Sequence, residues 1–99
     1  MTINTSKDGQ ITTISLEGRL DTTTAPDLEK ELDSVMAEDV SDLIFDLGKL
    51  DYISSAGLRV LLSAQKSMNK KGSMEIRGAS EDIMEIFEVT GFVDIFTIV

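Results

Sequence analysis

The sequence predicts a small α/β domain built around a mixed sheet. The chain has 99 residues, which is the size of one domain and too short for a second core. Segments with strand periodicity alternate with amphipathic helical segments in the order β-β-α-β-α-β-α-β. The turn sequence Asp8-Gly9 joins the first two strands as an antiparallel hairpin, whereas each later strand follows a helix, as in parallel β-α-β units. We therefore expect one domain over residues 1–99 with four or five strands.

The strand predictions rest on apolar runs and on the alternation of apolar and polar residues. In the second predicted strand, Thr12, Ile14 and Leu16 fall on one face at a spacing of two. The third is a short, mostly apolar run, which is typical of a strand buried in the middle of a partly parallel sheet. The five predicted strands are Ile3–Lys7, Ile11–Leu16, Leu43–Leu47, Ser73–Arg77 and Phe92–Val99.

The helix predictions rest on apolar residues at helical spacing and on residues that favour helix ends. Thr24 is the expected N-cap of the first helix, with Asp27 as its capping-box partner, and Ser80 is the expected N-cap of the third. Gly72 follows the second helix, where a glycine can adopt the left-handed C-cap conformation, and Thr90-Gly91 is expected to end the third. The three predicted helices are Thr24–Glu38, Ser55–Lys71 and Ser80–Thr90.

Composition narrows the function classes. The chain contains no cysteine and no histidine, so it cannot form a disulfide, a cysteine zinc site or a Ser-His-Asp triad. A formal net charge of −9 disfavours nucleic-acid binding, because phosphate backbones are repelled. No apolar run is long enough to span a membrane, and residues 1–5 do not resemble a signal peptide. We expect a cytoplasmic partner-binding module that uses no metal or cofactor, binds no nucleic acid and does not insert into membranes.

One segment combines several features of a modification site. Ser54 and Ser55 lie at the predicted start of the second helix, and Gly57 lies in its first turn. The first backbone N–H groups of a helix are unpaired and its dipole favours an anion, so a phosphate on Ser55 would meet a positive helix end. The same residues also have a purely structural interpretation, with Ser54 as an N-cap and Gly57 as a close-packing residue. The residues alone leave both interpretations open.

Three segments in register resemble the STAS domain family, which includes the anti-sigma factor antagonists. Residues 53–61, Ile-Ser-Ser-Ala-Gly-Leu-Arg-Val-Leu, are similar to the Asp-Ser-x-Gly-Leu signature of that family. Residues 16–21 resemble its Gly-x-Leu-Asp segment, and residues 83–92 resemble its third helix. The sequence departs from the family pattern at two points. Ser54 stands where the family commonly has Asp, and the sequence ends at Val99, where many members continue into a final helix.

The resemblance implies helices packed mainly on one face of the sheet and a role in bacterial transcription regulation. In that family, the unphosphorylated antagonist binds an anti-sigma factor that is also a serine kinase, which frees the sigma factor. Phosphorylation of the serine before x-Gly-Leu, here Ser55, ends the binding, and a metal-dependent serine phosphatase restores it. The alternative is an STAS accessory subunit of a transport complex, such as a lipid-transport assembly, that binds constitutively.

The expected site combines the resemblance with the strand order. Ser55 is the expected phospho-acceptor and the centre of the partner interface. Loops at the same ends of neighbouring parallel strands lie close together, so the loop before the first helix is expected beside it. An enzymatic function is not expected, because no His, Cys or clear Lys partner is available to activate a serine. The expected partner-binding residues are Asp21, Thr22, Ser54, Ser55, Gly57 and Arg59.

Overall fold

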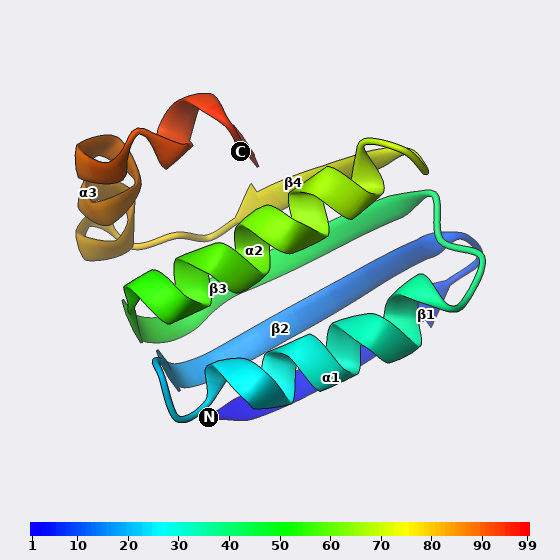
Figure 1. The fold of residues 1–99 in the computed structure, drawn as a ribbon, viewed down its shortest axis with the longest axis horizontal. Helices are drawn as coiled ribbons and strands as arrows, with labels where there is room; N and C mark the ends of the chain where they lie inside the picture. Colours follow the sequence, from blue (N-terminus) through cyan, green and yellow to red (C-terminus); the bar gives the residue numbers. More distant parts are fainter.

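The computed structural model describes residues 1–99 and contains one five-stranded sheet with the strand order β1-β2-β3-β4-β5 (Figure 1). β1 is antiparallel to β2, and the other neighbouring strands are parallel. This arrangement confirms the predicted mixed sheet. The strands are β1 Thr2–Asp8, β2 Ile11–Leu20, β3 Asp42–Ile53, β4 Ser73–Arg77 and β5 Thr97–Ile98.

The helices α1 (Ala25–Met36) and α2 (Ser55–Met68) lie side by side over one face of the sheet (Figure 1). Burial along β2 explains this choice of face: Thr12, Ile14 and Leu16 are buried, whereas the residues between them are not. The helix α3 (Glu81–Thr90) follows β4 and lies near the end of the sheet at which α2 begins. None of the three helices is long and apolar enough to cross a membrane.

The core lies between the sheet and the helices. It contains 23 buried apolar residues, which come mainly from β2, β3 and β4 and from all three helices. Each fully buried Leu, Ile, Val or Phe contributes roughly 1.5–3 kcal/mol to folding. Residues without solvent exposure include Leu28 of α1, Leu61 of α2 and Phe45 of β3. The core therefore fixes the start of α2 relative to the ends of β2 and β3.

The strands β2 and β3 are longer than their patterns predict, continuing to Leu20 and Ile53. Their pairing contains two register shifts, between Ser15 and Glu17 and between Gly18 and Arg19. The extra residues lie in β3, where the buried residues after Leu47 are Leu50 and Ile53, so a spacing of two no longer marks that strand. In β2 the alternation continues to Leu20, and Gly18 interrupts its apolar face. These extensions carry both strands to the edge where the candidate site lies.

The ends of the second and third predicted helices have different causes. α3 ends at Thr90 as predicted, and Gly91 after it adopts the left-handed conformation (φ 80°). Gly72 does not, so its prediction as a left-handed C-cap was wrong. A Cβ at position 72 would lie 2.0 Å from the carbonyl oxygen of Ser41, so glycine is required there for close approach of two backbones. The helix itself already ends at Met68.

The prediction of one continuous strand over Phe92–Val99 was wrong. Residues Phe92–Asp94 form a 3₁₀ helix, and only Thr97–Ile98 pair with β4 as β5. The rings of Phe92 and Phe96 pack edge to face with centroids 5.6 Å apart, and Phe96 makes the same contact with Phe87 of α3. Aromatic packing at a spacing of four therefore decides the local structure, although most residues of the run are apolar and favour a strand.

Candidate functional site

The candidate site lies where two neighbouring parallel strands end. Leu20 of β2 is in register with Ile53 of β3. The backbone N–H of Ser54 donates a hydrogen bond of 2.8 Å to the carbonyl oxygen of Leu20. The next residues, Asp21–Thr24 before α1 and Ser54–Ser55 at the start of α2, therefore lie at one edge of the sheet. We call these two segments the hydroxyl edge, because they contain three threonines and two serines.

The two serines of this edge have different environments. Ser54 is the N-cap of α2, with extended backbone (φ −95°, ψ 173°), and its hydroxyl accepts a hydrogen bond from the N–H of Gly57 at 3.3 Å. Its backbone carbonyl accepts from the N–H of Leu58 at 2.9 Å. Ser55 is the first residue of the helix and its side chain is exposed. Ser54 is thus engaged in the structure, and Ser55 is accessible from outside.

Gly57 provides the close packing between α2 and the strand ends. It is buried, and a Cβ at this position would lie 2.6 Å from Cγ of Leu20 and 3.1 Å from Cγ1 of Ile53. A side chain here would therefore collide with the core below α2. This contact supports the interpretation of Gly57 as a close-packing residue, which packs toward β2 and β3.

Asp21 organises the loop that precedes α1. Its Oδ1 accepts hydrogen bonds from the hydroxyl of Thr23 at 2.7 Å, from the N–H of Thr23 at 3.0 Å and from the N–H of Thr24 at 3.2 Å. The hydrogen bond from the Thr23 side chain is the main cause of a lowered pKa of Asp21, because it favours the carboxylate. Asp21 is therefore a charged acceptor that holds the loop in a fixed turn.

The predicted capping box of α1 was wrong. Thr24 is at the N-cap position, but its side chain makes no cap hydrogen bond to the helix. Its hydroxyl instead donates to the carbonyl oxygen of Arg19 at 2.8 Å and accepts from the N–H of Asp21 at 2.8 Å. Asp27 contributes no capping side chain and only donates its N–H to the Thr24 carbonyl oxygen. Asp21 and Thr24 both have side chains that can bond to backbone groups of this turn, and here both do so. The sequence alone therefore does not show which of them caps the helix.

The remaining predicted residues lie at or next to the hydroxyl edge. Thr22 is exposed in the loop. Arg59 is exposed and lies four residues after Ser55 on α2, so both side chains project from the same side of the helix. Leu58, between them, is buried in the core. Ser55, Thr22 and Arg59 are thus exposed to solvent. Asp21, Ser54 and Gly57 instead hold the loop and the start of α2 in place through hydrogen bonds and close packing.

The sequence interpretation missed one exposed pair beside this edge. The guanidinium carbon of Arg19 lies 4.3 Å from the centroid of the Tyr52 ring, and its Nε lies 3.7 Å from Oδ2 of Asp21. The two residues are partners in the register of β2 and β3, beyond the second register shift. No local pattern could pair them, because the shift decides which residues face each other across the strands.

The chemistry available at the start of α2 is anion binding. The N–H of Gly57 is taken by Ser54. The other N–H groups of a first helical turn have no partner within the helix, and the helix dipole is positive there. The first turn of α2 contains no acidic residue to oppose an anion. No group of three or more acidic side chains is placed to hold a metal ion. The geometry is compatible with a phosphate carried on Ser55.

Comparison with known proteins agrees with this architecture. The family model of the STAS domain matches residues 2–99. BtrV of Bordetella bronchiseptica, assigned as an anti-sigma factor antagonist, is 37% identical over 84 residues, which cover 84% of this chain and 72% of BtrV. The anti-sigma-B factor antagonist of Staphylococcus aureus is 28% identical over 96 residues, covering 96% of this chain and 89% of that protein.

Solved structures share the fold. An anti-sigma factor antagonist from Mycobacterium paratuberculosis superposes with a TM-score of 0.90 at 23% identity, covering 98% of this chain and 83% of that one. The unphosphorylated form of the anti-sigma factor antagonist SpoIIAA superposes with a TM-score of 0.78 at 14% identity, covering 99% and 87%. The family model spans almost the whole sequence, and the relatives and structures match over most of it. The chain therefore belongs to the STAS domain family.

Proposed function

We propose that this protein is an anti-sigma factor antagonist. Its unphosphorylated form binds an anti-sigma factor that is also a serine kinase, and phosphorylation of Ser55 ends that binding. The relatives in sequence are named as anti-sigma factor antagonists, and the match to BtrV covers most of both chains. The partner surface is the hydroxyl edge with the exposed Arg59.

One observation carries the assignment of Ser55 as the acceptor. The Ser54 hydroxyl accepts from the Gly57 N–H, whereas Ser55 is exposed at the first position of α2. A kinase needs access to the hydroxyl, and a product phosphate needs a favourable environment. Ser55 has both, because it lies at the positive end of the helix dipole.

The switch follows from electrostatics and needs no change of fold. Phosphorylation adds about −1.5 to −2 charges at pH 7. At the centre of an interface this charge must be desolvated or must face like charge, which costs several kcal/mol. Every 1.4 kcal/mol changes affinity about tenfold, so one phosphate lowers partner binding by orders of magnitude. In the free protein, the same phosphate is accommodated at the start of α2.

The protein acts as a binding module and relies on other proteins for catalysis. It has no histidine or cysteine to activate Ser55 as a nucleophile. The kinase is the anti-sigma factor itself, and a metal-dependent serine phosphatase removes the phosphate. Each of these partners is part of the proposal.

The test is a kinase assay with the cognate anti-sigma factor and ATP, read by intact mass and peptide mapping. We expect one phosphate on Ser55 and none in Ser55→Ala. Ser54→Ala serves as the matched control, because it changes the neighbouring hydroxyl and leaves the acceptor in place. Ser55→Ala is also expected to keep the anti-sigma factor bound in the presence of ATP, while the native protein is released.

Two results would contradict the proposal. Phosphate on Ser54 or on Thr22–Thr24, with Ser55→Ala still modified, would show that the acceptor is wrong. A stable complex with a transport protein and no modification by any partner kinase would favour the alternative, a constitutively bound accessory subunit of a transport complex.

A further inference from the structure

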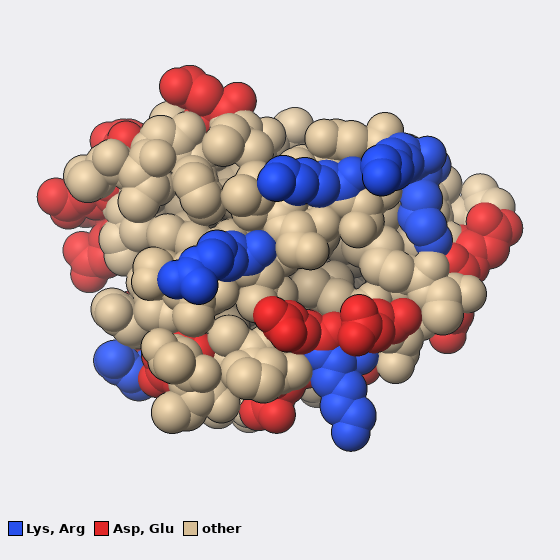
Figure 2. Space-filling model, in the orientation of Figure 1, with Lys and Arg blue, Asp and Glu red and all other residues tan.

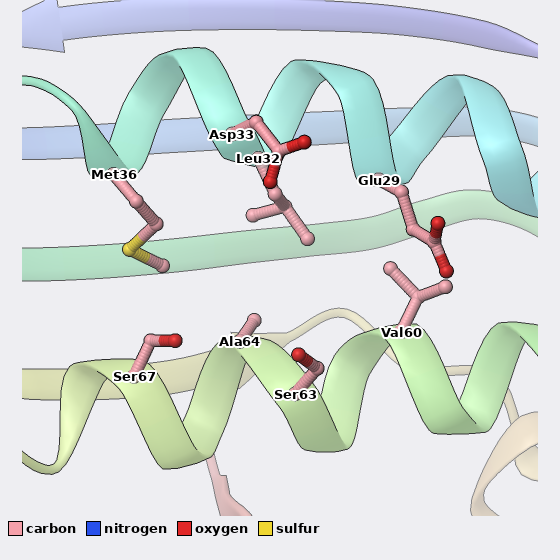
Figure 3. A pocket seen from close by; sticks show the side chains of 8 residues that line it. All are labelled: Glu29, Leu32, Asp33, Met36, Val60, Ser63, Ala64 and Ser67. Atoms are coloured by element: carbon pink, nitrogen blue, oxygen red, sulfur yellow. The ribbon is translucent and has the colours of Figure 1, made fainter.

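A groove lies between the outer sides of α1 and α2. Its volume is about 310 Å³, and Figure 3 shows side chains of both helices directed into it. Leu32 of α1 and Val60 of α2, which are largely buried, form its apolar floor. This volume is at the lower limit of ligand pockets, roughly 300–1,000 Å³, so the groove suits a few side chains of a protein partner better than a cofactor.

The wall formed by α1 is acidic. Glu29 and Asp33 lie four residues apart, so their side chains project from the same side of the helix. Both are exposed, and neither takes part in an ion pair within the chain. Figure 2 shows the acidic side chains together over α1 on this face of the molecule. This wall is complementary to cationic side chains.

The wall formed by α2 has a different character. Ser63 and Ser67 contribute hydroxyl groups to the groove. Together with Ala64 they have small side chains, so this wall projects little into the groove. Arg59 and Lys66 are exposed on the same helix outside the groove, and Figure 2 shows basic side chains along α2. The face therefore carries negative charge along α1 and positive charge along α2. A segment with charges of both signs fits it better than a uniformly basic segment.

We propose that the α1–α2 groove is a second docking site, which receives an amphipathic helical segment of a partner protein. The segment places apolar side chains over the floor, arginine or lysine side chains against Glu29 and Asp33, and carboxylates toward Lys66. A helix in a groove of this kind contacts it through residues at a spacing of three and four. The site requires nothing from Ser55 and so stands apart from the proposed phosphorylation switch.

The experiment uses a synthetic helical peptide with a leucine stripe, arginines on one flank and glutamates on the other, and no net charge. Neutrality matters, because a basic peptide would bind any surface of a protein with a net charge of −9. We expect saturable one-to-one binding by calorimetry, with amide shifts in NMR spectra concentrated in residues 29–36 and 60–67. Ser55→Asp is expected to bind the peptide as the native protein does, which separates this site from the switch.

Two groove variants and one matched control decide the outcome. Glu29→Arg with Asp33→Arg reverses the acidic wall, and Ser63→Trp fills the groove without changing charge; each should weaken binding at least tenfold. Glu85→Arg with Glu88→Arg reverses two exposed carboxylates of α3 and should change affinity less than twofold. The absence of binding, equal losses in the α3 control, or amide shifts centred outside the two segments would overturn the proposal.

Discussion

At the scale of single residues, Ser54 and Ser55 show how adjacent residues of one type take different roles. The backbone of Ser54 is extended, which brings its hydroxyl to the Gly57 N–H, and Ser55 already has helical geometry. In the family, an aspartate is common at the position of Ser54, and aspartate is also a preferred N-cap. The serine found here therefore preserves the cap. The hydroxyl of Ser55 remains available for modification.

The carboxylate of Asp21, in the loop before α1, should make the stability of the protein depend on pH. Asp21 has a pKa below its ordinary value of 3.8, so its ionised form stabilises the folded state above that pH. This stabilisation is lost as the pH falls through the lowered pKa of the folded state. We expect the stability difference between the native protein and Asp21→Asn to be constant near pH 6 and to shrink below about pH 4.

Urea unfolding at several pH values measures this difference. Asp27→Asn is the matched control, because Asp27 lies in the first turn of α1, close to this loop, and only its backbone N–H forms a hydrogen bond there. A gap between the native protein and Asp21→Asn that widens on acidification would contradict the proposed role of the hydrogen bonds from Thr23.

The close packing around Gly57 predicts that a larger side chain at this position lowers stability. A Cβ at this position would lie 2.6 Å from Cγ of Leu20, which is fully buried. We expect Gly57→Ala to destabilise the protein by about 1–3 kcal/mol, although alanine is the better helix former by up to ~1 kcal/mol. Chemical denaturation measures the change, and Ser55→Ala, an exposed neighbour, should stay within about 0.5 kcal/mol of the native protein. Equal or higher stability of Gly57→Ala would contradict the close contact.

At the scale of secondary-structure elements, the N-caps of α2 and α3 can be compared directly. Ser54 accepts from the Gly57 N–H at 3.3 Å, and Ser80 accepts from the Ile83 N–H at 3.2 Å. We expect Ser54→Ala and Ser80→Ala each to lower stability by about 1 kcal/mol. Thr24→Ala is a useful contrast, because its hydroxyl links Asp21 and Arg19 instead of capping α1.

Thermal and urea unfolding distinguish these variants. The two cap variants should lose stability without losing the phosphorylation of Ser55, since the acceptor is unchanged. If Ser54→Ala were as stable as the native protein, the hydrogen bond to Gly57 would contribute nothing to the start of α2.

The sequence predicts elements well where one local signal dominates. Helix α3 illustrates this, because Ser80 and Gly91 mark its two ends and both act as expected. The extension of β3 to Ile53 was missed because bulges change the spacing of its buried residues from two to three. The extension of β2 to Leu20 was missed because Gly18 interrupts its apolar face. The segment after Gly91 was missed because the contacts of Phe92 and Phe96 override a strand-like apolar run.

The candidate site is predictable to a similar extent. The strand order alone places Asp21 near Ser54, and the structure brings them together through the hydrogen bond between Ser54 and Leu20. The stacking of Arg19 on Tyr52 could not be predicted, because it depends on the register of two strands far apart in the sequence. Tertiary register is thus the part of the site that local patterns do not encode.

At the scale of the whole molecule, the residues that stabilise the fold are separate from the residues proposed to contact a partner. The sheet and its 23-residue core hold the ends of β2 and β3 in place, and the helices cover one face. Ser55 lies outside this core, at the first residue of α2, where new charge does not enter the apolar interior. A charge added at Ser55 should therefore affect partner binding more than folding. The stability of the free protein and its affinity for the partner are expected to change in opposite directions.

We expect Ser55→Asp to raise the stability of the free protein by about 0.3–1 kcal/mol, because a carboxylate at the first position of α2 interacts favourably with the helix dipole. The same substitution should weaken binding to the anti-sigma factor at least tenfold, and less than phosphorylation does, since it adds only one charge. Urea unfolding and calorimetric titration measure the two effects. Ser63→Asp is the control for stability, because it places the same charge in the middle of α2, away from the dipole end, and should bring no such gain. A variant that loses stability and binding together would indicate local unfolding of α2, and the loss of affinity could then not be attributed to charge in the interface.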